Sequence, residues 1–274
     1  MKKILLFSLL AAILLTICGC GSLSSKFGGK RIPESPVADF QYEIEDGEVK
    51  ITKYIGSDRE VRIPAEIKDR PVTVIGRNAF KEYDLLYIYI PENVVLIDES
   101  AFYCCRFLET VVLPESLRDI GDGAFSGCEA LKKIEIPRSV TALKYGTFQN
   151  CTSLNSVKLY ENLLIIECDA FENCKMLTEI KLPDRLRTIE AGAFEGCDNL
   201  KELHIPAHTR IEVEYKKDVR YNGEDYFFCA SPFYIAAWRQ ALPEITTVLV
   251  VKENSYAHQE LLNNEGLGIN FKVQ

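Results

Sequence analysis

The sequence predicts a mixed, β-rich solenoid, in which short strands from successive units of about 23 residues stack along one axis. Three residue types recur at this period, and only the first step between phenylalanines is one residue shorter. A constant period over so many positions indicates a repeat architecture. Phenylalanine marks one position, proline marks a second in all units but one, and cysteine marks a third. The three series are Phe80, Phe102, Phe125, Phe148, Phe171 and Phe194; Pro91, Pro114, Pro137, Tyr160, Pro183 and Pro206; and Cys105, Cys128, Cys151, Cys174 and Cys197.

Each unit is expected to contribute one strand with a single buried face. In Leu177–Pro183, the apolar residues Ile180 and Leu182 alternate with polar residues, which is the pattern of a half-buried strand. Pro183 ends the strand because proline has no N–H to donate to a ladder. The other apolar residues return the chain over the core. One unit cannot bury them alone, but stacked units can, and each buried phenylalanine then contributes about 1.5–3 kcal/mol.

The repeated pattern, I-x-L-P-x-x-L-x-x-I-x-x-x-A-F-x-x-C, resembles the treponemal-type, or BspA-like, leucine-rich repeat of bacterial surface proteins. It occurs in residues 88–105, 111–128, 134–151, 157–174 and 180–197. The opening stretch YEIEDGEVKITKYIG and the closing stretch SYAHQELLNNEGLGINFKV resemble the usual start and end of such domains. The resemblance implies a leucine-rich-repeat arc and binding to host or neighbouring-cell proteins. It names no ligand, because repeat scaffolds host many partners.

Residues 1–19 predict a lipoprotein signal peptide. Two lysines precede an apolar run, Ile4–Ile17, which is short for a membrane span. A glycine then precedes Cys20, as in a bacterial lipobox, so Cys20 is the predicted lipidation site. Cys18 is the poorer acceptor, because isoleucine would occupy the small-residue position before it. An ordinary secretory signal and an uncleaved anchor remain alternatives. The Gly-, Ser- and Pro-rich residues 20–38 predict the lipid anchor with a flexible tether.

The remaining chain divides at changes in the repeat pattern. Residues 39–79 predict an N-terminal cap with a first irregular rung, and its Asp46-Gly47 pair predicts a β-hairpin. Residues 80–209 predict the regular repeats. The pattern then breaks in residues 210–243, which are interpreted as an insertion in the last rung. Residues 244–274 predict a C-terminal β/α cap.

A hairpin turn, a short helix and a last strand are expected beyond the regular repeats. Asn222-Gly223 predicts a second hairpin turn inside the insertion. Ser255 is a candidate cap for a short helix that ends near Gly266. A last strand is expected at residues 269–273.

Composition and motifs argue against several function classes. A net charge of −8 and a pI near 5.2 argue against a nucleic-acid partner. Neither G-x-S-x-G nor H-E-x-x-H occurs, so we expect no enzyme and no cofactor. His204 and His208 have the spacing of a metal pair, but Pro206 ends the strand between them. We therefore expect no metal site.

The five repeated cysteines are interpreted as buried free thiols. Equivalent residues in successive rungs stack about 4.8 Å apart with parallel Cβ vectors. A disulfide instead needs Cβ atoms about 3.8 Å apart and convergent vectors. Cys104, Cys168 and Cys229 lie outside this column, and their redox state is left open.

Function is expected at the positions that vary between units, on the outward side of the strands, because solenoids bind through such concave surfaces. We expect a non-enzymatic adhesion protein that is exported and lipid-anchored to the bacterial cell membrane or cell surface. Its partner would be a protein of the host matrix, a neighbouring cell or the envelope, and Cys20 would bind the membrane. The predicted partner-binding residues are Tyr87, Tyr89, Thr110, Val112, Lys133, Glu135, Lys158, Glu179 and Lys181.

Alternatives to this hypothesis remain. The outward positions could form a solvated charged face in which Tyr87 and Tyr89 are merely tolerated. The chain could instead be a structural or accessory subunit of a cell-envelope assembly that docks through residues 210–243. An enzyme built on that insertion is the third possibility.

Overall fold

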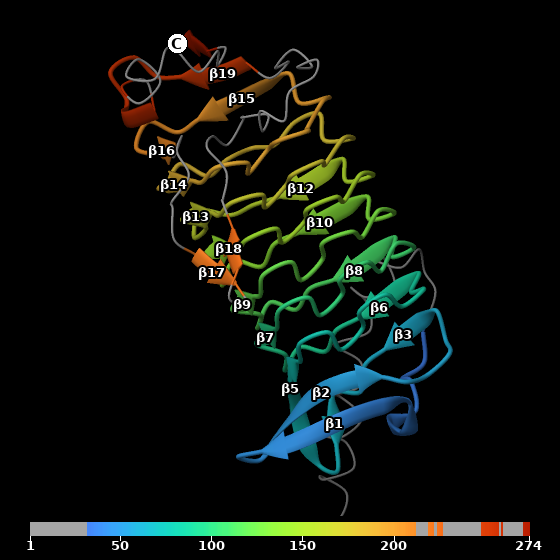
Figure 1. The fold of residues 1–274 in the computed structure, drawn as a ribbon. Helices are drawn as coiled ribbons and strands as arrows, with labels where there is room; N and C mark the ends of the chain where they lie inside the picture. Colours follow the sequence, from blue (N-terminus) through green and yellow to red (C-terminus); the bar gives the residue numbers. More distant parts are fainter. Residues whose placement is uncertain (1–31, 212–218, 222–223, 227–247, 258, 260–270) are drawn as a thin grey trace, which may run out of the picture. The chain divides into compact units, whose positions relative to one another are not determined.

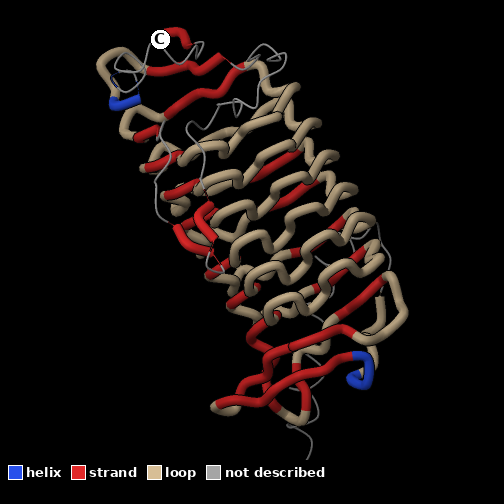
Figure 2. The backbone as a smooth tube through the Cα atoms, in the orientation of Figure 1, coloured by secondary structure: helices blue, strands red, loops and turns tan. Residues whose placement is uncertain are grey.

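The computed structural model describes residues 32–211, 219–221, 224–226, 248–257, 259 and 271–274. The chain divides into two compact units, Met1–Glu34 and Ser35–Gln274. The second unit is a solenoid whose short strands recur in two columns (Figures 1 and 2). Within each column the strands are parallel, and partners such as Lys133 and Ser156 are one repeat apart. The prediction of a repetitive, β-rich solenoid is confirmed.

The first column contains the strands that precede the proline position in the repeats, and β19 and β20 continue it at the C-terminal end. It forms three hydrogen-bonded groups, β3-β6-β8, β10-β12 and β15-β19-β20. Its strands are β3 (Glu60–Arg62), β6 (Tyr87–Tyr89), β8 (Thr110–Val112), β10 (Lys133–Glu135), β12 (Ser156–Lys158), β15 (Glu202–Ile205), β19 (Val248–Val251) and β20 (Phe271–Val273).

The second column contains the strands that precede the phenylalanine position in the repeats, and all of them after β5 have two residues. It forms two hydrogen-bonded groups, one of which continues from the N-terminal hairpin through β5, β7 and β9. Its strands are β5 (Arg70–Ile75), β7 (Leu96–Ile97), β9 (Asp119–Ile120), β11 (Ala142–Leu143), β13 (Ile165–Ile166), β14 (Thr188–Ile189) and β16 (Arg210–Ile211).

One predicted strand does not form a ladder. Residues 178–183 lie between β12 and β15 and are not assigned to a strand. Ile180 and Leu182 are nevertheless buried, and Glu179 and Lys181 are exposed. The alternation that predicted a strand is therefore present in the side chains without the hydrogen-bonded ladder.

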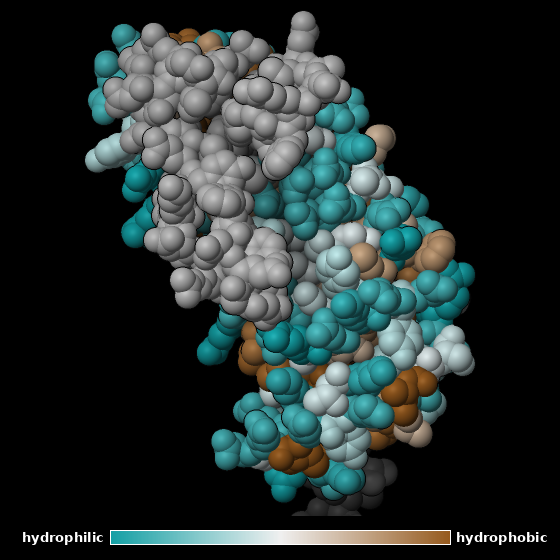
Figure 3. All heavy atoms as spheres, viewed as in Figure 1, coloured by the Kyte–Doolittle hydropathy of each residue, from teal (hydrophilic) through white to brown (hydrophobic). Residues whose placement is uncertain are grey.

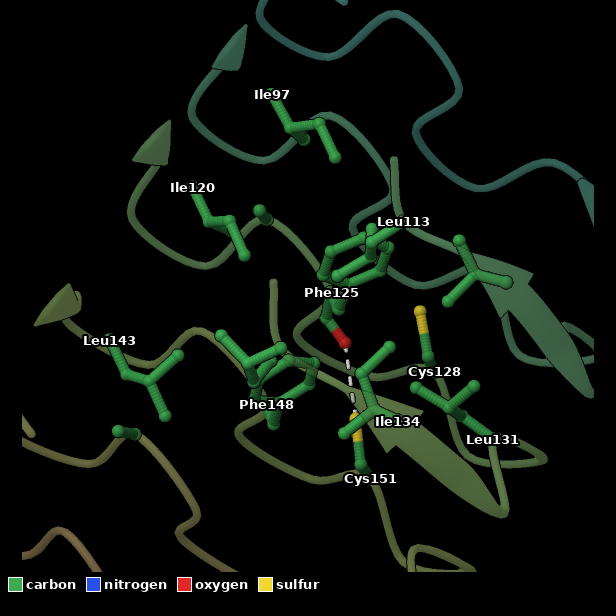
Figure 4. Close-up of a cluster of buried hydrophobic side chains, with 14 of the residues drawn as sticks. Ile97, Leu113, Ile120, Phe125, Cys128, Leu131, Ile134, Leu143, Phe148 and Cys151 are labelled. Carbon is green, nitrogen blue, oxygen red and sulfur yellow. Dashed lines mark hydrogen bonds between the residues drawn. The ribbon is translucent and has the colours of Figure 1, made fainter. Parts of the chain in front are cut away.

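The phenylalanine column forms a continuous aromatic stack inside the solenoid. Successive rings from Phe80 to Phe194 lie 5.1–5.7 Å apart, with planes tilted by 5–16°. Tyr54 extends the stack at the N-terminal end, 5.4 Å from Phe80. Such offset contacts stabilise aromatic pairs beyond the burial of their area. Figure 4 shows Phe125 and Phe148 facing the apolar side chains of both strand columns.

The five repeated cysteines form a second column beside these rings. Each thiol donates a hydrogen bond to the carbonyl oxygen of the phenylalanine in the preceding rung, over 3.0–3.3 Å. Figure 4 shows one such bond, from Cys151 to Phe125. All five are buried and free, so the free-thiol interpretation is confirmed for them. Burial raises the pKa of the Cys105 and Cys197 thiols to about 12.

Two backbone positions in every regular unit require left-handed geometry, which the sequence analysis did not identify. The residues two before and two after each phenylalanine have φ between 56° and 74°. Glycine, asparagine and aspartate adopt this region most easily. The positions are occupied by Asn78, Ser100, Gly123, Gly146, Asp169 and Gly192, and by Glu82, Cys104, Gly127, Asn150, Asn173 and Gly196.

The N-terminal hairpin forms where the sequence predicts it. Strand β1 (Phe40–Glu45) pairs antiparallel with β2 (Glu48–Tyr54), and both Asp46 and Gly47 have positive φ. Two such residues are what a type I′ turn requires. A short 3₁₀ helix (Val37–Asp39) precedes the hairpin, and β4 (Glu66–Ile67) pairs with β5.

Beyond residue 211 the structure describes short segments. Strand β19 pairs directly with β15, well beyond one repeat along the chain. Strands β17 (Val219–Tyr221) and β18 (Glu224–Tyr226) pair antiparallel on either side of the predicted turn, whose two residues lie outside the described part. The chain becomes helical at Tyr256, directly after Ser255 as predicted, and the end of that helix lies outside the described residues.

Candidate binding surface

We define the strand face as the outward side chains of the first column and of residues 179 and 181, which hold the equivalent position in the rung without a ladder. They belong to Glu60, Arg62, Tyr87, Tyr89, Thr110, Val112, Lys133, Glu135, Ser156, Lys158, Glu179, Lys181, Glu202 and His204. The register places the predicted binding residues of successive strands side by side, because Tyr87 pairs with Thr110 and Tyr89 pairs with Val112. In the same way, Glu135 pairs with Lys158.

The exposure of the predicted residues differs between the two ends of this face. Toward the C-terminus they are exposed: Lys133, Glu135, Lys158, Glu179 and Lys181. Toward the N-terminus, Tyr87 and Thr110 are half-buried. The middle rungs present mostly hydrophilic residues in Figure 3, with scattered hydrophobic ones nearer the N-terminal cap.

The expectation that Tyr89 and Val112 are exposed is wrong. Each retains only 8% of its surface, although both stand in the outward register. The guanidinium group of Arg62 lies over the ring of Tyr89, 5.0 Å from its centroid. Val112 lies beside Tyr89 in the register. The N-terminal part of the strand face therefore presents Tyr87 and the arginine rather than two exposed tyrosines.

Two of the predicted charges neutralise each other. Lys158 Nζ lies 2.6 Å from Glu135 Oε1, and this hydrogen bond raises the pKa of Lys158. In contrast, the side chains of Lys133 and Lys181 have no hydrogen-bond acceptor or ion-pair partner within the described part of the chain. These two lysines are available to an outside carboxylate without breaking an internal contact.

Sequence reasoning missed one feature at the edge of the strand face. Tyr160 occupies the position at which the other units have proline. Its hydroxyl donates to Glu135, and the side chains of Arg138 and Lys158 lie over its ring. The sequence could have pointed to this feature, because Tyr160 is the one exception in the proline series.

His204 and His208 lie in different elements, as the proline between them predicts. His204 lies on β15 beside Glu202, with Nε2 3.7 Å from Oε2, and His208 lies in the following turn. Lys272 lies 2.6 Å from Glu202 and lowers the pKa of that carboxyl. Within the described ranges, no group of three or more His, Cys, Asp or Glu residues is arranged to hold a metal ion.

The predicted anchor and most of the predicted insertion lie outside the described residues. These parts include Cys20, the signal peptide and Cys229. In the described part of the chain, no helix has the length and apolar character needed to cross a membrane. Cys104 and Cys168 are free and half-buried, and the Cys168 thiol lies 3.4 Å from Glu190 Oε2.

Stacked rungs with an invariant core and a variable outward face define a leucine-rich-repeat protein. The chain belongs to the BspA type leucine rich repeat region family, whose model matches six copies of the repeat over residues 73–201 and 153–216. A comparison with curated proteins finds no match.

Two solved structures give the same fold. A leucine-rich repeat protein of T. pallidum is 28% identical with a TM-score of 0.51, over 61% of this chain and 91% of that chain. One from Eubacterium ventriosum is 22% identical with a TM-score of 0.53, over 67% of this chain and 51% of that chain. A third match, a leucine rich cell surface protein of Faecalibacterium prausnitzii, is 17% identical with a TM-score of 0.43, over 89% of this chain and 96% of that chain.

Proposed function

We propose that this protein is a non-enzymatic binding protein that presents its strand face to a protein partner at the bacterial surface. One observation carries the proposal: the inward positions repeat from unit to unit, whereas the outward positions differ and are exposed over the middle rungs. A constant core with a variable exposed face lets each rung make a different contact with a partner. Solenoids generally bind through such extended surfaces.

The two ends of the strand face would make different contributions. Tyr87 is the candidate anchor near the N-terminus, because tyrosine is enriched among residues that dominate binding energy. Lys133, Lys181 and Glu179 would set register and the rate of encounter, since rim charges act mainly on association and its salt dependence. Tyr89 and Val112 are buried and would offer a partner little contact area.

The anchoring of the protein is part of the same proposal. The basic start, the short apolar run and the glycine before Cys20 support export followed by lipid attachment at Cys20. Lipid at this residue would hold the solenoid at the bacterial cell membrane or cell surface, with residues 21–38 as the tether.

The test begins with capture of a partner. The chain from Gly21 onward is immobilised and exposed to matrix proteins and to an extract of the cell's own envelope. The captured partner is then measured against a variant with Lys133→Glu and Lys181→Glu. Because neither lysine has a partner among the residues that the structure describes, this variant should fold normally and bind more weakly. A control with Lys175→Glu and Arg187→Glu makes the same charge change outside the strand face. Equal loss in both variants would contradict a specific role for the strand face.

The assembly-subunit alternative is favoured by one observation, the β17–β18 hairpin within the 210–243 insertion. A strand pair outside the regular repeats can take up a strand of another chain at its edge. Deleting residues 212–243, which leaves β16 and the buried Ile211 in place, separates the two functions. A strand-face binder keeps its partner, whereas an assembly subunit loses it.

A further inference from the structure

Tyr160 is not required by the turn in which it lies. In other units the proline carbonyl accepts the N–H of the residue three positions later, at 3.1 Å for Pro114 and 3.0 Å for Pro183. The carbonyl of Tyr160 makes the same bond to Leu163, at 3.0 Å. The turn therefore forms equally well with either residue. The other units have proline at this position. The large aromatic side chain of Tyr160 therefore points to a role other than stabilising the turn.

Tyr160 gathers charged side chains from its own rung and the preceding one. The guanidinium of Arg138 lies 4.1 Å from its ring centroid, and the Lys158 ammonium lies 4.9 Å away. Its hydroxyl donates to Glu135, which also binds Lys158. We call these four residues the Tyr160 cluster. These four side chains already hold one another in place. They would therefore lose little conformational freedom when a partner binds.

Arg138 is the member of the Tyr160 cluster with unused hydrogen-bonding groups. Its side chain is exposed, and no acceptor for its guanidinium occurs among the described residues. A guanidinium stacked on an aromatic ring keeps its in-plane N–H groups available. These groups form a planar fork that matches the two oxygens of a carboxylate.

We propose that the Tyr160 cluster is a carboxylate-binding anchor on the edge of the strand face, which takes an aspartate, a glutamate or a chain-terminal carboxylate of the partner protein. This inference rests on the proposed binding function and names one contact within it. Arg138 binds the carboxylate bidentately, and the ring of Tyr160 holds the guanidinium in place.

The surrounding charges indicate a single carboxylate rather than a polyanion. Glu115 and Glu161 occupy the position of Arg138 in the two neighbouring rungs, and both are exposed. They would repel a nucleic acid or a sulfated glycan that extends along the rungs. One carboxylate that approaches Arg138 in the plane of its guanidinium avoids them.

The experiment uses a library of random peptides displayed on phage and selected on the full chain. Selected peptides are then measured on Tyr160→Pro, which restores the residue of the other units, and on Arg138→Lys, which keeps the charge but removes the fork. The structure records no acceptor for the N–H of Tyr160 in the described part, so the proline should cost no backbone hydrogen bond. Arg185→Lys, at an exposed arginine without a partner in that same part, is the matched control.

We expect the selected peptides to share an acidic residue or a free terminal carboxylate, and to lose about tenfold in affinity on either cluster variant. Replacing that carboxylate by its amide should cause a similar loss, and heparin should not compete. The proposal is wrong if no peptide is selected, if the peptides bind Tyr160→Pro as well as the unaltered chain, or if they lack a required carboxylate. The broader binding function would survive that failure if its captured partner still depends on Tyr87.

Discussion

At the scale of single residues, the thiol column shows how repetition determines reactivity. The five buried cysteines share one environment, and burial raises the pKa of each thiol above its usual value. The thiolate is the reactive form, so a raised pKa suppresses alkylation and oxidation. Cys104 and Cys168 differ because they are half-buried and outside the column.

We therefore predict that the five column thiols resist alkylation in the folded protein at neutral to mildly alkaline pH. Cys104 and Cys168 should react first, and all seven should react after denaturation without a reductant. Mass spectrometry after a short pulse of iodoacetamide measures both states. Disulfides between successive members of the column would overturn the free-thiol interpretation.

The aromatic stack makes a second prediction at this scale. Phe148 is fully buried between Phe125 and Phe171, at 5.7 and 5.6 Å from their rings. Phe148→Ala should lower the free energy of unfolding by about 3–5 kcal/mol, because it leaves a cavity inside the stack. Denaturant titration followed by circular dichroism measures the change. Phe107→Ala is the control, since that ring is 48% exposed and should cost much less. Comparable losses would mean that the stack is not the core.

At the scale of the element, the second column aligns carboxylates of neighbouring rungs. Glu167 and Glu190 follow β13 and β14 and are therefore adjacent in the register. Glu167 Oε2 accepts the N–H of Tyr145 at 3.1 Å. Burial, and then the charge of Glu190, raise the pKa of Glu167 above its usual value of 4.5. The folded state thus favours the protonated form of this carboxyl.

A raised carboxyl pKa contributes stability that is fully present below the unfolded-state pKa and is lost as the pH rises through the folded-state value. Glu167→Gln keeps an acceptor for Tyr145 but cannot ionise. It should raise the free energy of unfolding at neutral pH, by at most about 1 kcal/mol because the side chain is only half-buried. The gain should shrink as the pH falls toward 4.5. Unfolding titrations across this range test it. Glu161→Gln, at an exposed carboxyl without a partner among the described residues, should show no such gain.

Features that recur at the repeat period could be predicted from the sequence. Features that depend on which side chains lie in the adjacent rungs could not. Each phenylalanine ring contacts its copy in the next rung, and each column thiol contacts the phenylalanine carbonyl of the preceding rung, so period alone places both. The burial of Tyr89 depends on Arg62 in the preceding rung, and no periodic signal reports that contact. Similarly, the pattern of residues 178–183 predicts side-chain alternation, whereas a ladder also depends on the backbones of the adjacent rungs.

At the scale of the whole molecule, the proposed anchor makes the next prediction. Diacylglycerol at Cys20 provides two acyl chains, which hold a protein stably, whereas a single myristoyl chain binds membranes with a constant of only about 10⁴ M⁻¹. Cys20→Ser should abolish incorporation of labelled lipid. Cys18→Ser is the control and should leave labelling intact. Label that persists in Cys20→Ser and disappears in Cys18→Ser would place the lipid on the other cysteine.

The central claim is that the strand face holds the binding site, and the affinity of Tyr87→Ala for the captured partner tests it most directly. Tyr256→Ala is the control, because that tyrosine is 63% exposed and lies outside the strand face. If Tyr87 is an anchor, its loss should weaken binding by about 2 kcal/mol or more, roughly 30-fold, with no effect in the control. Unchanged affinity in Tyr87→Ala, together with loss of the partner on deleting residues 212–243, would contradict the claim and place the site in the insertion.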